Sequence, residues 1–180
     1  MMTWRWRKRM YMWYCAAAYF TFLLVFLGLA SSVWTESSTD VESIQSGLLS
    51  FCKHNHKDSR HECGVLDFGR VPAWLDASRI FAGLSVILLF SMTPVSCYLY
   101  FEDDKREDVL IFTLFGVVSA LFGLLSAILY AALRDTSQGA LSWGFAVFTS
   151  GHVIAMLLFS VLCVLNVWPK WKAPVRPFYY

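Results

Sequence analysis

Four long apolar segments limit the folds that this chain can adopt. They run over residues 10–33, 80–101, 109–133 and 141–168, and charged residues lie almost entirely outside them. A transmembrane helix needs about 20 mostly apolar residues, and each segment meets that length. In hydrocarbon every backbone polar group must bond within its own segment, so each segment is predicted to be a helix. The sequence therefore indicates an all-α membrane protein that crosses the bilayer four times.

The composition agrees with this interpretation. Charged residues make up 16% of the chain, whereas soluble domains carry about 25%. A net charge of +2 is too small to favour nucleic-acid binding. The apolar core of a cleavable signal is only about 7 to 15 residues long. The first segment is longer, so we expect it to remain as an anchor in spite of the small residues at 30–32.

Basic residues predict the orientation of the chain. Lys and Arg gather on the cytosolic side of short loops. They are concentrated in the segments 1–9, 102–108 and 169–180, which lie on one side of a four-pass chain. We therefore expect both termini to be cytosolic and the loops 34–79 and 134–140 to be extracellular. The first basic cluster is also typical of a contact with anionic lipid, which is an alternative to simple anchoring.

The loop 34–79 contains Cys52 and Cys63, separated by the polar run KHNHKDSRHE. Of the five cysteines in the chain, these two are the pair expected outside the cytosol. Disulfides form and persist in that oxidising compartment. A disulfide between Cys52 and Cys63 is therefore predicted.

The histidines of this run raise two alternatives. His54, His56 and His61 lie between the cysteines and supply further metal donors. However, the paired C-x-x-C or H-x-x-x-H spacing of structural zinc sites is absent, and a dithiol redox site would also need C-x-x-C. We expect no metal site and no cofactor, and a solvated hairpin tip whose histidines could respond to pH.

Residues around these cysteines form a pattern. Trp34 follows the first apolar segment, GLLSFC stands at 47–52, and Cys63 follows Cys52 after ten residues. With four apolar segments, the chain resembles the claudin superfamily, whose outer loop carries W … G-L-W-x-x-C … C. The segment VPAWLDASRIFAG at 71–83 is similar to the start of the second helix in that superfamily, which has an arginine where this chain has Arg79. The residues that carry the resemblance are Trp34, Gly47, Leu48, Cys52, Cys63 and Arg79, whereas Leu49 replaces the second tryptophan.

The resemblance extends to several branches of the superfamily. The segments at 71–83 and SWGFA at 142–146 look like the peripheral myelin protein and epithelial membrane protein branch. GLLSFC followed by LDF at 66–68 also resembles the lipoma HMGIC fusion partner-like branch. The loop 134–140 is shorter than in claudins that polymerise into strands. The sequence does not choose among these branches.

The resemblance implies a fold and a function. The fold is a left-handed bundle of four helices under a small extracellular antiparallel β-sheet, which the disulfide ties together. The function is that of a non-enzymatic plasma-membrane protein that organises cell contacts, including junctions, or membrane domains. The alternative is an accessory subunit of an ion channel or receptor. In both cases the expected partners are the lipid bilayer and other membrane proteins.

Small residues recur along the third apolar segment. Gly116, Ser119, Gly123 and Ser126 follow one another at steps of three and four. Such a seam lets helix backbones approach closely, so it predicts packing within the bundle, with contact to another membrane protein as the alternative. His152 is the ionisable residue deepest in a segment, and we expect a neutral, hydrogen-bonded packing residue rather than part of a proton relay.

Two further sequence features indicate contacts on the cytosolic side. Cys15, Cys97 and Cys163 lie near the expected cytosolic ends of the first, second and fourth helices, where cysteines can be palmitoylated. Inert apolar packing is the alternative for all three. The chain ends in Tyr180, and a terminal aromatic residue with its carboxylate suits a PDZ groove.

Overall fold

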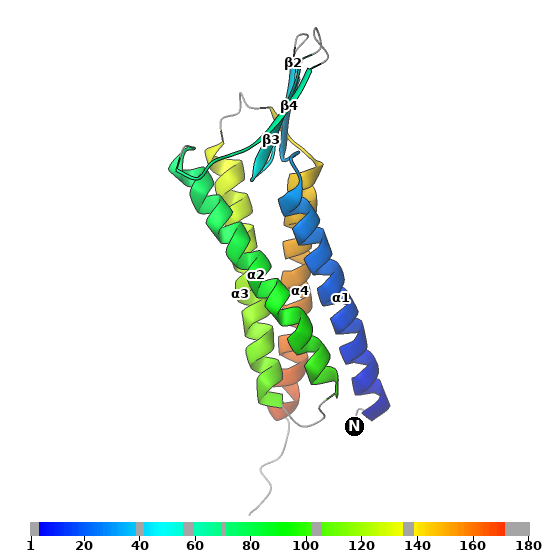
Figure 1. The fold of residues 1–180 in the computed structure, drawn as a ribbon. Helices are drawn as coiled ribbons and strands as arrows, with labels where there is room; N and C mark the ends of the chain where they lie inside the picture. The colour runs from blue at the N-terminus through cyan, green and yellow to red at the C-terminus, as the bar shows by residue number, and fades with distance from the viewer. Residues whose placement is uncertain are drawn as a thin grey trace, which may run out of the picture.

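The structure of the chain is a computed structural model that describes residues 4–38, 42–55, 60–69, 71–101, 106–134 and 139–171. Within these residues four long helices stand side by side (Figure 1). They are α1 (Trp4–Ala30), α2 (Ala73–Phe101), α3 (Arg106–Leu133) and α4 (Trp143–Trp171). Each is long and apolar enough to cross a membrane, over Met12–Ala30, Ala73–Met92, Ile111–Leu133 and Trp143–Val164. Within these residues the prediction of four helices long and apolar enough to cross a membrane is confirmed, and they are consistent with a multi-pass membrane protein.

All four described helices begin at residues other than those the apolar segments predict, α1 at Trp4 rather than 10 and α3 at Arg106 rather than 109. α2 starts at Ala73, before residue 80, and the Leu75 N–H bonds the Pro72 carbonyl at 2.9 Å in its first turn. The early turns of α2 contain Asp76 and Arg79, which break the apolar pattern in the sequence but neutralise each other in the fold. α4 starts at Trp143 because the residues just before it are drawn into the sheet.

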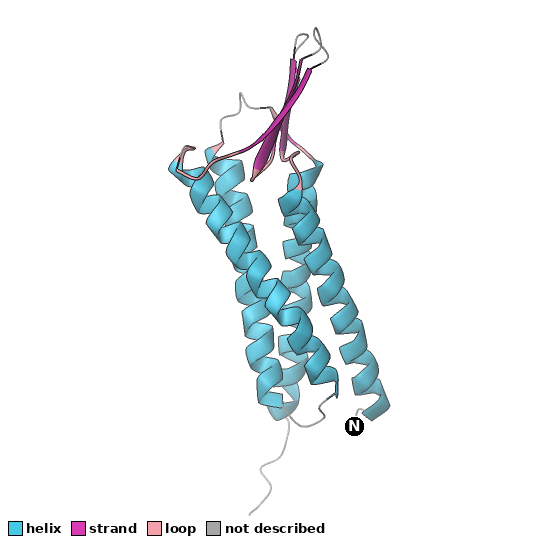
Figure 2. Ribbon diagram, viewed as in Figure 1, coloured by secondary structure: helices cyan, strands magenta, loops and turns pink. Residues whose placement is uncertain are grey.

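A small antiparallel sheet covers one end of the bundle (Figure 2). Its five described strands are β1 (Thr35–Ser38), β2 (Glu42–Ser46), β3 (Ser50–Asn55), β4 (Arg60–Val65) and β5 (Ala140–Leu141), in the order β4-β3-β2-β1-β5. Four of them come from the connection between α1 and α2, and β5 comes from the connection between α3 and α4. The sheet therefore joins both connections at the same end of the molecule.

The helices pack in a ring, with α1 and α3 each lying against both α2 and α4. Their inner faces bury small and polar residues, whereas large apolar side chains such as Phe20, Ile87, Ile128 and Leu157 lie exposed on the outer faces. In a membrane these outer faces contact lipid tails, which are as apolar as leucine. The outer faces therefore suit a bilayer, and close packing and hydrogen bonds join the helices.

Candidate functional site

Trp34 fixes the sheet to the ends of three helices. Its side chain is fully buried, and its indole N–H donates a 2.7 Å hydrogen bond to the Gly28 carbonyl in the last turn of α1. The last carbonyls of a helix have no donor within the helix, so this bond satisfies one of them. The ring centroid lies 4.9 Å from those of Tyr130 in α3 and Phe148 in α4, and 5.6 Å from that of Phe145.

The backbone of Trp34 joins two further parts of the chain. Its N–H donates to the Ser46 carbonyl at the end of β2 at 3.0 Å, and its carbonyl accepts from the Ser142 N–H at 2.8 Å. Ser142 lies between β5 and α4. Because side chain and backbone are both engaged, Trp34 sets the position of β1 relative to the bundle.

Gly47 and Leu48 form the turn between β2 and β3, which lies against the connection that follows α1. The Gly47 N–H donates to the Ser50 carbonyl at 2.7 Å. A Cβ atom on Gly47 would meet the Ser31 carbonyl and lie 2.8 Å from the Ser32 Cα, so only glycine allows this approach. The Leu48 side chain is fully buried in the core below the turn.

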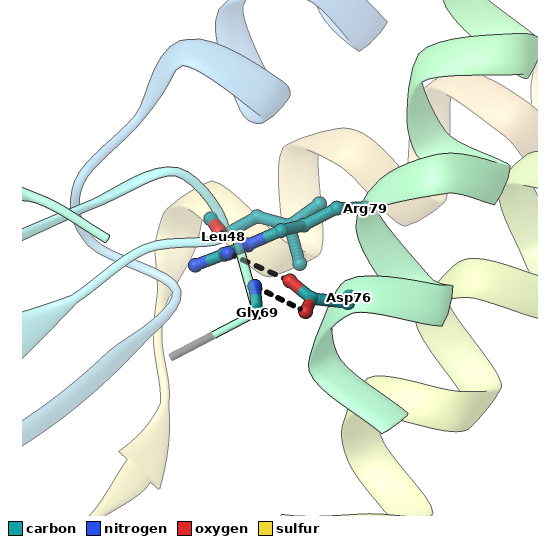
Figure 3. Close-up of polar contacts among 4 residues, drawn as sticks. All are labelled: Leu48, Gly69, Asp76 and Arg79. Atoms are coloured by element: carbon teal, nitrogen blue, oxygen red, sulfur yellow. Dashed lines mark hydrogen bonds and ion pairs between the residues drawn. The ribbon is translucent and has the colours of Figure 1, made fainter. Parts of the chain in front are cut away.

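Arg79 holds the same turn from the side of α2 (Figure 3). Its Nε donates to the Leu48 carbonyl at 2.7 Å, and its Nη1 donates to Asp76 Oδ1 at 3.1 Å. The other carboxylate oxygen of Asp76 accepts from the Gly69 N–H at 2.9 Å. The guanidinium carbon lies 5.2 Å from the Phe68 ring centroid, within the range of a cation–π contact. Arg79 is only 3% exposed, so these contacts offset the burial of its charge.

These four residues, Trp34, Gly47, Leu48 and Arg79, together with their contacts, form what we call the seat of the sheet. The other two residues that carry the family resemblance, Cys52 and Cys63, lie farther along the sheet. Cys52 and Cys63 are opposite each other on β3 and β4 and form a disulfide, as predicted. The disulfide links neighbouring strands and restricts the unfolded chain between them.

The distal end of the sheet lies beyond the disulfide, and we define it by His54, His61, Lys53 and Glu42. The rings of His54 and His61 stack with centroids 4.0 Å apart. Lys53 Nζ lies 2.6 Å from Glu42 Oε2. This hydrogen bond, together with the negative charge of Glu42, raises the pKa of Lys53 above its ordinary value. His56 lies outside the described residues.

The small-residue seam of α3 faces α2 and α4 inside the bundle. The Ser126 hydroxyl donates to the Ser78 carbonyl at 2.8 Å, and the Ser119 hydroxyl donates to the Ser85 carbonyl at 2.7 Å. A Cβ atom on Gly116 would lie 2.5 Å from the Phe159 ring of α4. Ser119 and Ser126 are fully buried. The seam is therefore occupied by neighbouring helices and is not open to another membrane protein, because its atoms already meet α2 and α4.

His152 lies fully buried against this seam. Its Nδ1–H donates a hydrogen bond to the Phe148 carbonyl, with the two heavy atoms 2.9 Å apart. A neutral ring that donates from Nδ1 accepts at Nε2, and the Ser85 hydroxyl lies 3.0 Å from that atom. Gly123 leaves room for the ring, since a Cβ atom there would collide with it. These contacts give His152 a packing role that joins α2, α3 and α4.

The features expected on the cytosolic side are only partly described. Cys15 in α1 and Cys163 in α4 are half-buried. Cys97 lies in α2, but its side chain falls outside the described residues, as does Tyr180. Acylation of Cys97, Cys163 or Cys15 and a PDZ contact through Tyr180 stay predictions.

No family model matches this chain, and no curated protein sequence matches it.

The residues that the sequence singles out are therefore interpreted from their contacts. Four residues that complete the seat and the seam were not singled out from the sequence: Asp76, Tyr130, Ser78 and Ser85. Ser78 and Ser85 had a signal, because they lie seven positions apart on one face of a helix, as the seam residues do. Asp76 had one too, the i, i+3 spacing to Arg79, whereas Tyr130 had none.

Proposed function

We propose that this chain is a non-enzymatic membrane protein of the claudin type that organises cell contacts or membrane domains through its sheet. The observation that supports the proposal is the way in which the sheet is attached to the bundle. Its base is held by side-chain and backbone contacts to the bundle, while its strands project away from the helix ends (Figure 1). Such a rigid, projecting sheet suits recognition of another protein.

The contacts of the signature residues support the claudin resemblance. Trp34, Gly47, Leu48 and Arg79 come from separate stretches of the chain but meet at one structural feature, the seat. Chance matches to a motif would not be expected to share one contact region. In the proposed family fold the bundle is left-handed and the sheet is extracellular.

The proposed orientation places both termini in the cytosol and the sheet outside. The disulfide supports it, because such bonds persist on the oxidising side of a membrane. Antibody against an N-terminal tag should stain cells only after permeabilisation, whereas a tag placed in the segment 56–59 should be stained on intact cells. Staining of the N-terminal tag on intact cells would contradict this orientation.

The surface of β2 provides a test of the contact. Ile44 is 38% exposed on one face of the sheet, and its neighbour Gln45 faces the other side, because successive residues of a strand alternate. Exposed apolar residues near the centre of a patch are typical of protein interfaces. We therefore expect Ile44 to lie in the contact and choose Gln45 as the matched position.

The experiment mixes two cell populations that carry different tags on this protein. The proposal predicts that both tags concentrate where the two populations touch and not at free edges. Ile44→Arg should lower this enrichment at equal surface delivery, whereas Gln45→Arg, beside Glu36, should preserve it. Equal amounts at contacts and free edges for the unmodified protein would contradict the contact-organising role.

The accessory-subunit alternative has a different signature in the same cells. A sheet that contacts the ectodomain of a channel or receptor should bring down one larger membrane protein after crosslinking in intact membranes. Recovery of mainly this chain, with enrichment at contacts, favours the contact organiser. Recovery of a single larger partner without such enrichment favours the accessory subunit.

A further inference from the structure

The sheet ladder holds His54 and His61 opposite each other. Facing residues in an antiparallel pair alternate between a close type, with Cα atoms about 4.5 Å apart, and a wider type at about 5.5 Å. Cys52 and Cys63 have Cα atoms 4.1 Å apart, so they form a close pair. His54 and His61 stand two steps farther along the same uninterrupted register. They therefore form a close pair as well, on the same face of the sheet as the disulfide.

The two imidazole rings lie side by side, and the His61 ring is open to solvent. Their centroids lie 4.0 Å apart, and the ring planes differ by 18°. His54 is half-buried and His61 is exposed. Lys53 and Glu62 separate these pairs along the ladder and point to the opposite face, since side chains alternate. On β2 the residue facing His54 is Ser43, which carries no charge.

This arrangement suits a divalent transition-metal ion. Imidazole nitrogens are preferred ligands of copper, zinc and nickel. Each binds the ion at about 2.0–2.1 Å, so two such nitrogens lie about 3 Å apart. Stacked rings direct their nitrogen lone pairs side by side, so both rings must turn about χ1 and χ2 before two nitrogens converge on one ion, and χ2 has broad minima. We propose that His54 and His61 form a two-histidine site for a divalent transition-metal ion such as Cu²⁺ or Zn²⁺.

The proposed site differs from a structural zinc site, whose C-x-x-C or H-x-x-x-H spacing this chain lacks between Cys52 and Cys63. Structural zinc has four protein ligands, and within the described residues no group of three His, Cys, Asp or Glu side chains gathers. An ion on His54 and His61 therefore keeps open positions for water or for a donor from a bound molecule. Such an ion exchanges readily, and Cu²⁺ should bind more tightly than Zn²⁺.

The test uses the purified full chain in detergent, with no histidine tag, titrated calorimetrically with CuCl₂ and separately with ZnCl₂. His54→Gln and His61→Gln should each weaken Cu²⁺ binding by at least about tenfold, since even the partners that orient metal ligands are worth that much. Lys53→Gln, on the opposite face of the same strand, should leave the affinity unchanged. Non-reducing gel mobility checks that every variant keeps the Cys52–Cys63 disulfide.

Electron paramagnetic resonance of the Cu²⁺ complex gives a readout that folding alone does not. The unmodified chain should show hyperfine coupling to two imidazole nitrogens, and each histidine variant should lose one of them. Failure to bind Cu²⁺, a spectrum without two imidazole nitrogens, or an affinity in either histidine variant equal to that of the unmodified chain would overturn the proposal. An equal loss in Lys53→Gln would also overturn it, because the effect would then belong to the hairpin as a whole.

Discussion

The two ends of the sheet are built by different physical means. At the seat, one tryptophan and one arginine are almost wholly buried, and each bonds a backbone carbonyl. At the distal end the side chains are polar and largely open to solvent, and the strands are held by their ladder and one disulfide. The seat therefore fixes where the sheet stands, and the distal end presents chemistry without being required for that position.

The seat also carries a cost from a buried donor. Arg79 Nη2 is buried and has no hydrogen-bond partner among the described residues. A buried donor left unsatisfied costs about 1–3 kcal/mol. The other contacts of the guanidinium offset this cost, so the seat should be sensitive to substitutions that the distal end tolerates.

Trp34 provides the strongest test of the difference between the seat and the distal end. Trp34→Ala should destabilise the protein by about 3–5 kcal/mol, because it removes a fully buried ring and leaves a cavity. The measurement is the thermal midpoint in detergent, monitored through the loss of the monodisperse size-exclusion peak. His61→Ala is the matched change at the exposed distal end and should shift the midpoint little. Equal shifts for the two variants would contradict the division of the sheet.

The disulfide lies between the two ends, so its removal should have an intermediate effect. Replacing both Cys52 and Cys63 by alanine should cost about 2–4 kcal/mol. The seat should persist, because its contacts do not involve the cysteines. Trypsin should then cut after Lys53 faster than in the unmodified chain, while the membrane-spanning fragments stay associated on size exclusion. Separation of those fragments would show that the seat depends on the disulfide.

Substitutions at two glycines test whether the helices below the seat are tightly packed. Gly123→Ala should cost about 1–3 kcal/mol, because the added Cβ collides with His152. Gly83→Ala is the control in another spanning helix, where a Cβ would meet nothing within 4 Å. Thermal midpoints of the two variants measure the difference. Alanine has the higher helix propensity, so Gly83→Ala should leave the midpoint unchanged or raise it. A midpoint lowered equally by both variants would show that the loss does not come from the collision with His152.

The sequence predicts these regions unequally, for physical reasons. Helices of spanning length are evident because lipid demands long apolar segments. The facing of His54 and His61 depends on strand register, which the hydrophobic pattern and the turn set together, and a polar hairpin provides little pattern. The strand β5 is only two residues long, so it has no period of its own. Asp76 pairs locally with Arg79, but its bond from the Gly69 N–H arises only when the chain before α2 folds back onto the helix.

The smallest effect is expected at the ion pair of Lys53 and Glu42, at the distal end. The pair raises the pKa of Lys53 above 10.5, so the folded protein holds this proton more tightly than the unfolded chain does. Its contribution to stability is present below that pH and is lost as pH rises through the raised pKa. Because Lys53 is well exposed, the contribution should be small.

The thermal midpoint of Lys53→Gln should therefore lie slightly below that of the unmodified chain at neutral pH, and the two should converge above about pH 10.5. Salt at about 1 M should also bring them together, because it shortens the screening length to about 3 Å. A difference that persists in both conditions would mean that the lysine stem packs on the sheet. The distal end would then owe part of its stability to side-chain burial, as the seat does, and the contrast between the two ends would be one of degree.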